Sequence, residues 1–126
     1  GLIKLFDISE GKEAKPVGSW QGHVNAIYSM VSYSVKGGKK QIWLGGTDGF
    51  VSVYPEHARE QRNMLKKWSV SKKKTARIRS MTVVKTKESK QVWIGEITSD
   101  ISIWSWDSYT SIGSVTLDSS NVSEIV

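Results

Sequence analysis

The chain has 126 residues, room for one compact domain, and its composition of 38% apolar and 24% charged residues is typical of folded globular proteins rather than disordered ones. Its net charge is +6. It contains no cysteine, which excludes disulfides and thiolate chemistry and favours a reducing compartment, so we expect a cytoplasmic protein. No apolar run approaches the roughly 20 residues that a membrane-spanning helix needs.

The first part of the chain contains short segments rich in β-branched and aromatic residues, a pattern typical of strands. Leu2–Phe6 and Val17–Trp20 are expected to be the outer strands of a partial unit that covers residues 1–23. A full unit follows over residues 24–71, with strands expected near 25–35, 40–46, 50–55 and 64–70. Within it, Thr47-Asp48-Gly49 is expected to be a hairpin turn, because Asp-Gly between apolar runs is a strong hairpin signal.

A second full unit is expected over residues 72–118, with strands near 77–85, 90–96, 101–106 and 111–117. Residues 119–126 are expected to begin a further unit, because Val122–Ile125 resembles Val24–Ile27.

An internal repeat of about fifty residues supports these units. Lys40–Gly45, with the sequence KQIWLG, recurs 50 residues later as Lys90–Gly95, KQVWIG. A period of this length indicates a repeat architecture. The central strands are apolar on both faces, which requires a neighbour on each side, and four-stranded units stacked in this way are typical of propellers. The predicted fold class is therefore all-β: a β-propeller fragment of two full four-stranded antiparallel blades with partial blades at both ends.

Two short motifs add a family resemblance. Gln21-Gly22-His23 lies between an outermost strand and the next innermost one, and Thr47-Asp48-Gly49 forms the turn of the following unit. With these motifs the chain resembles the WD-repeat superfamily over essentially its whole length. The resemblance implies structural roles for His23 and Asp48 in a buried hydrogen-bond network with a tryptophan of the third strand, although Tyr54 stands at that tryptophan position.

The Ile-x-x-Met and aliphatic-Trp-aliphatic-Gly segments are similar to propellers attached to Rho exchange factors, kinase-pathway scaffolds, Roco kinases and inositol phosphatases. This implies a protein-binding scaffold within a larger signalling protein.

We expect no enzyme activity, metal site or cofactor in the chain. His23 and His57 are not in a metal-binding arrangement, and the carboxylates are scattered. Gly45–Gly49 is glycine-rich but lacks the Gly-Lys-Ser/Thr of a phosphate-binding loop, so we interpret it as a hairpin turn.

One basic segment suggests a function other than that of a protein-binding scaffold. Between Lys66 and Lys90 lie ten Lys or Arg residues and a single acidic one, Glu88. The segment is either a solvated loop or a site for acidic proteins or anionic lipid headgroups, including phosphoinositides. Nucleic acid is not expected, because the basic residues are not interleaved with exposed aromatics. The candidate residues for an anionic partner are Lys72, Lys73, Lys74, Arg77 and Arg79.

Trp106 is a candidate protein contact, because Glu56 stands at its place in the preceding unit; the alternative is that it packs against a neighbouring blade. Closed propellers have typically 4 to 8 blades, so further blades are expected from a longer chain or from self-association.

Overall fold

The computed structural model describes residues 1–8, 13–33, 40–71, 76–98 and 100–116. Its strands form three antiparallel sheets, and one turn of 3-10 helix, Gln61–Asn63, is the one helical element in this part of the chain. The strands are β1 (Leu2–Asp7), β2 (Lys15–Gln21), β3 (Ile27–Tyr33), β4 (Gln41–Gly46), β5 (Phe50–Pro55), β6 (Lys66–Ser69), β7 (Ile78–Lys85), β8 (Lys90–Glu96), β9 (Asp100–Ser105) and β10 (Ser111–Thr116).

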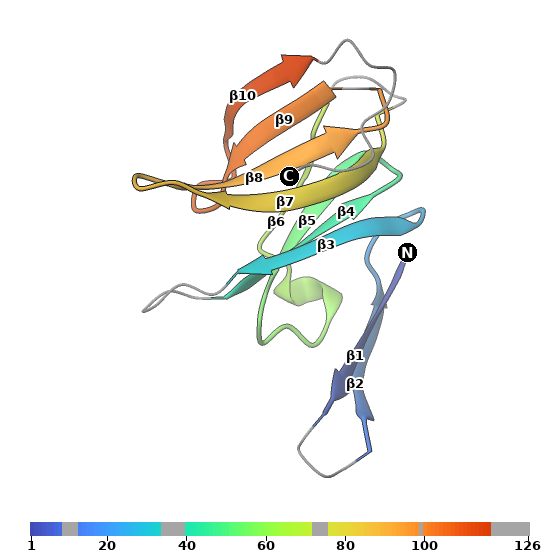
Figure 1. Cartoon of the computed structure of the whole chain (residues 1–126). Coiled ribbons are helices and arrows are strands. Elements are labelled where there is room, and N and C mark those ends of the chain that lie inside the picture. The colour runs from blue at the N-terminus through green and yellow to red at the C-terminus, as the bar shows by residue number, and fades with distance from the viewer. Residues whose placement is uncertain (9–12, 34–39, 72–75, 99, 117–126) are drawn as a thin grey trace.

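The two full units each form one four-stranded sheet in chain order. The first sheet is β3-β4-β5-β6 and the second is β7-β8-β9-β10, while β1 and β2 form a separate hairpin. The three layers are stacked, with the first sheet between the hairpin and the second sheet (Figure 1). The all-β class and the four-stranded antiparallel units predicted from the sequence are confirmed, and the described residues form no closed ring.

The expected turn at residues 47–49 is also confirmed. Gly49 has a positive φ of 80°, which glycine adopts without steric cost. The backbone N–H of Phe50 donates to the Asp48 carboxylate at 3.0 Å, so the aspartate side chain closes the turn between β4 and β5.

Alternation along the strands divides each sheet into two faces. On the first sheet, Trp43, Val51 and Val53 face the second sheet and are fully buried, whereas Ile42 and Leu44 face the hairpin. The larger core lies between the two four-stranded sheets and contains Trp43, Val51, Val53, Ile78, Met81, Val92, Ile94 and Trp106.

A smaller core lies between the first sheet and the hairpin. Its buried residues are Leu44, Tyr54 and Ala58, with Ile3 and Trp20 of the hairpin packed against them. Because a two-stranded hairpin replaces a four-stranded sheet on this side, the face over β3 and β4 is covered only in part.

No helix in the described part of the chain is long and apolar enough to cross a membrane.

Candidate functional site

The connection from β2 to β3 brings His23 over the turn between β4 and β5. Its Nδ1 lies 3.0 Å from both carboxylate oxygens of Asp48, and its Nε2 lies 2.8 Å from the Ser52 hydroxyl. His23 is 1% exposed and Ser52 is fully buried. The contacts fit a neutral imidazole whose Nδ1–H donates to Asp48 while Nε2 accepts from Ser52. The network ties a connection, a turn and a central strand together.

A glycine makes room for this imidazole. A Cβ added at Gly46 would lie 2.7 Å from His23 Nδ1 and 2.6 Å from an Asp48 carboxylate oxygen. Any side chain at position 46 would therefore displace the network.

The two titratable members of the network have shifted pKa values. Burial lowers the pKa of His23 below its ordinary value of 6.5, although the Asp48 carboxylate acts in the opposite direction. Burial alone would raise the pKa of Asp48, but the hydrogen bonds from His23 and from the Phe50 backbone outweigh it and hold the pKa below 3.8. Both shifts favour a neutral histidine beside an ionised aspartate at neutral pH.

Acidification is therefore expected to destabilise the fold. Unfolded His23 takes up a proton near its ordinary pKa of 6.5, whereas folded His23 resists protonation, so stability is lost as the pH falls below that value. The depressed pKa of Asp48 adds a second loss below 3.8. Urea unfolding at a series of pH values checks this expectation. Unchanged or rising stability on acidification through pH 6.5 would contradict it.

The second sheet has a different hydrogen bond at the position that corresponds to Ser52 of the first sheet. Ser102 occupies the place of Ser52, and Trp104 Nε1–H donates to its hydroxyl at 2.9 Å. In the first sheet Tyr54 stands at the place of Trp104, and its buried hydroxyl accepts a hydrogen bond from Trp20 Nε1–H of the hairpin at 3.0 Å. Tyr54 therefore links the sheet to the hairpin and is not joined to the histidine.

Sequence reasoning identified His23 and Asp48 but missed Ser52. A serine within a run of apolar strand residues, VSVY and ISIW in the two units, was the available signal, because a buried hydroxyl requires a hydrogen-bond partner.

The prediction that Trp106 contacts a partner is wrong for this structure, and its alternative holds. Trp106 is 1% exposed and lies against the first sheet, with its ring stacked on Trp43 at a centroid distance of 5.5 Å and an interplanar angle of 11°. Tyr33 contacts the same ring edge-on at 6.0 Å. Trp106 is therefore part of the core between the two sheets.

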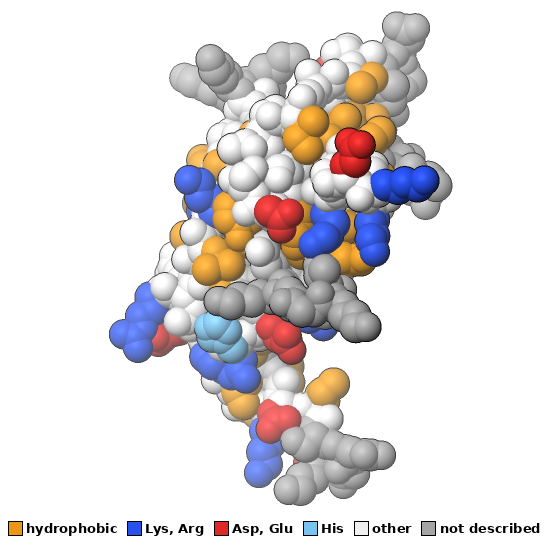
Figure 2. Space-filling model, turned by 90° about the vertical axis from the view of Figure 1, so that its left-hand side faces the viewer, with side chains coloured by type: hydrophobic (Ala, Val, Ile, Leu, Met, Phe, Trp, Pro, Cys, Tyr) orange, Lys and Arg blue, Asp and Glu red, His pale blue; other side chains and the backbone are white. Residues whose placement is uncertain are grey.

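The candidate residues for an anionic partner are only partly placed. Lys72, Lys73 and Lys74 lie outside the described residues. Arg77 and Arg79 are exposed on either side of the buried Ile78 at the start of β7. On the face shown in Figure 2, Lys and Arg side chains lie in several separate places with acidic side chains between them.

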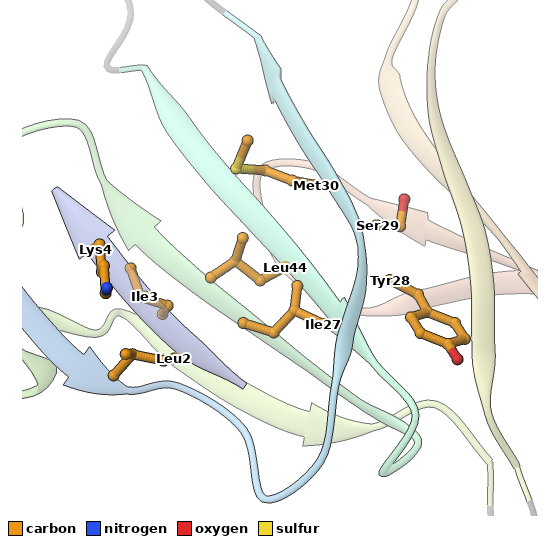
Figure 3. A pocket seen from close by; sticks show the side chains of 8 residues that line it. All are labelled: Leu2, Ile3, Lys4, Ile27, Tyr28, Ser29, Met30 and Leu44. Atoms are coloured by element: carbon orange, nitrogen blue, oxygen red, sulfur yellow. The ribbon is translucent and has the colours of Figure 1, made fainter. Parts of the chain in front are cut away.

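An apolar pocket of about 330 Å³ opens between β1 and the first sheet (Figure 3). Ile3 and Leu2 of the hairpin face Ile27 and Leu44 across it, and Met30 lies at its end. A smaller pocket of about 110 Å³ shares Ile3, Met30 and Leu44 with it and extends toward Trp20, Ile42, Tyr54 and Glu56. Within the described ranges, no group of three or more His, Asp or Glu residues is arranged to hold a metal ion.

No family model and no curated protein matches this chain.

Proposed function

We propose that the chain is a non-catalytic protein-interaction scaffold, a WD-repeat-like β-propeller fragment within a larger cytoplasmic signalling protein. The observation that carries the proposal is the stacking of two repeated four-stranded sheets, in which opposite faces of successive units meet. Such head-to-tail contacts continue from unit to unit and form rings or open arrays.

The outer faces of the stack support the same proposal. Trp93, Ile101 and Ile103 lie on the face of the second sheet that points away from the first, and all three are only half-buried. Their counterparts Trp43 and Val51 are fully buried against the next sheet. The outer face of the second sheet is therefore apolar, like the face of the first sheet that the second sheet covers.

The same reasoning assigns no catalytic step to His23 and Asp48. Both side chains are used in a buried structural network, and a reactant has no access to a histidine that is 1% exposed. Their role in this proposal is to set the position of the connection between β2 and β3.

Protein recognition is tested by panning a random peptide library displayed on phage against the immobilised chain. The scaffold proposal expects enriched peptides that compete with one another for one surface. An absence of enrichment over an unrelated β-protein of similar charge would contradict it.

The second candidate function is binding of phosphoinositides or other anionic lipids, favoured by the exposed Arg77 and Arg79 beside the lysine run. Sedimentation with phosphatidylcholine vesicles, with and without phosphatidylinositol bisphosphate, separates the two functions. The scaffold proposal expects no phosphoinositide-dependent sedimentation. Binding that is lost when Lys72, Lys73 and Lys74 are all changed to Glu would instead establish the lipid function, because each basic residue near an anionic surface contributes about 1 kcal/mol.

A further inference from the structure

We propose that the tip of the β7–β8 hairpin, residues 85–90, binds an acidic segment of a partner protein, whose carboxylates pair with Lys85, Lys87 and Lys90. The proposal rests on the scaffold function above and specifies one surface and the charge of the partner that this surface recognises. The three lysines belong to the basic segment of the chain but lie apart from Arg77 and Arg79.

The structure divides the basic segment between the two ends of β7. Arg77 precedes the strand and Arg79 lies in its first turn of the pleat, whereas Lys85 is its last residue. Six residues separate Arg79 from Lys85, a distance of roughly 20 Å at about 3.3 Å per residue. Exposed charges are largely screened beyond about 8 Å at physiological ionic strength. The two groups of basic residues therefore act independently of each other.

The hairpin tip concentrates positive charge. Lys85 and Lys87 are exposed, and Lys90 is half-buried as the first residue of β8. Lys85 pairs directly with Lys90 across the two strands, and like charges that face each other in this way destabilise a sheet. Within the described ranges, no ion pair joins any of these lysines to a carboxylate. An acidic partner would offset this repulsion.

Hydrogen bonds between Thr86 and Ser89 hold the turn in shape. The Thr86 backbone N–H donates to the Ser89 carbonyl at 2.8 Å, and the Ser89 backbone N–H donates to the Thr86 hydroxyl at 3.0 Å. The Thr86 hydroxyl donates in turn to the Ser89 carbonyl at 3.0 Å. The lysines therefore extend from a preformed turn, so a partner that binds them does not have to order this backbone first.

Lys90 is also placed by its contacts outside the hairpin. Its ammonium lies 5.9 Å from the centre of the Tyr33 ring in the first sheet, and its carbonyl accepts from the Trp106 backbone N–H at 3.0 Å. Lys40 is the counterpart of Lys90 in the first unit, and its carbonyl accepts from the Glu56 backbone N–H at 3.1 Å. The same lysine thus recurs at the same end of both sheets and extends the basic surface from one sheet to the next.

The tip is accessible to a partner. Figure 1 shows the β7–β8 hairpin reaching out at the left of the molecule beyond β9 and β10, and Figure 2 looks onto that side. Residues 85–89 are all exposed. The surface is formed by adjacent strands of one complete sheet and their own turn.

The chemistry of the tip favours spaced carboxylates over phosphates. Its basic residues are all lysines, whereas two-point recognition of phosphate is a property of the arginine guanidinium. Glu88 follows Lys87 in the turn and repels a densely charged polyanion, such as a lipid surface or a nucleic-acid backbone. An extended acidic segment can place its carboxylates on either side of Glu88. The partner that fits this surface is therefore an acidic polypeptide.

The test is fluorescence anisotropy of a fluorescein-labelled glutamate octapeptide titrated with the whole chain. We expect saturable binding that weakens as the salt concentration rises, because exposed ion pairs are screened. The double variant Lys85→Glu with Lys87→Glu should weaken binding by roughly tenfold or more, because it replaces two attractions by two repulsions. Glu88→Gln should strengthen binding, since it removes the one negative charge of the tip.

The matched control is the double variant Lys15→Glu with Lys66→Glu. Both residues are exposed lysines of the outer strands β2 and β6, so this variant has the same net charge as the tip variant. Its affinity for the peptide should stay within about twofold of that of the unchanged chain, because the changed charges lie away from the tip. Circular dichroism spectra should be the same for the two variants, since neither changes a buried residue.

No binding of the octapeptide, or equal weakening by the two double variants, would overturn the proposal. Sedimentation with vesicles containing phosphatidylinositol bisphosphate that depends on Lys85 and Lys87 would also overturn it, because the tip would then recognise a lipid. In each of these cases, peptides from the phage library that bind another surface would leave the scaffold function standing.

Discussion

Trp43→Ala is expected to lower the free energy of unfolding by about 3–5 kcal/mol, the range for removing a fully buried tryptophan. Trp43 has no exposed surface and contacts the rings of Trp106, Trp68 and Tyr109 at centroid distances of 5.5, 5.2 and 5.8 Å. Its removal leaves a cavity where the two sheets meet. Because domains are stable by only about 5–15 kcal/mol, this loss is a large part of the total. Equilibrium unfolding in urea measures it.

Trp93→Ala is the matched control. Trp93 occupies the same position in the repeat, and its Nε1–H donates to Gln91 as that of Trp43 donates to Gln41. It lies on the outer face and is half-buried, so we expect a loss of about 1 kcal/mol. Equal losses for the two variants would contradict the arrangement of the faces described above.

His23→Ala is expected to cost about 3 kcal/mol, because it leaves a partly buried carboxylate and a buried hydroxyl without their shared partner. Asp48 keeps its bond from the Phe50 backbone, but Ser52 Oγ loses the imidazole that it contacts at 2.8 Å. The variant should also lose the part of the acid destabilisation that begins below pH 6.5, since that part comes from His23 itself.

His57→Ala is the control for this second variant. His57 is an exposed residue of the turn after β5, so its removal should change the free energy of unfolding by less than about 0.5 kcal/mol. A His23→Ala variant as stable as His57→Ala would show that the buried network does not hold the connection in place.

The strands could be predicted from the sequence because the alternation of residues along them occurs in both repeat units. The KQIWLG and KQVWIG segments became β4 and β8, and the turn at Asp48-Gly49 followed from the residue types alone. The ends were less accurate: β6 is confined to Lys66–Ser69, where a strand over 64–70 was expected.

The assignment of faces was not predictable in the same way. Trp43 and Leu44 are neighbours on opposite faces of β4, and both are buried, so alternation does not tell which face meets the next four-stranded sheet. The side on which the Trp106 ring packs was likewise not predictable from the sequence. It follows the end of β9 in a turn, and only the position of the second sheet decides that its ring stacks on Trp43 rather than facing solvent.

The histidine network was predictable in part. Gly22-His23 and Asp48 carry the family resemblance, but the third member, Ser52, depends on strand register, because it is placed by the pairing of β5 with Leu44 of β4. The pocket beside β1 could not be predicted, because it depends on tertiary packing. A two-stranded hairpin packs on this face of the first sheet, where a four-stranded sheet would cover Met30.

Amide hydrogen exchange resolved by NMR tests the central claim, which is that two complete four-stranded sheets form the core and that, among the described residues, β1 pairs with β2 alone. The account predicts slow exchange throughout β4, β5 and β8, which have neighbours on both sides. In β1 it predicts slow exchange at alternate amides, which face β2, and fast exchange at the others. Uniformly slow exchange along β1 would contradict this pairing, and fast exchange in β4 or β8 would contradict the packed sheets themselves.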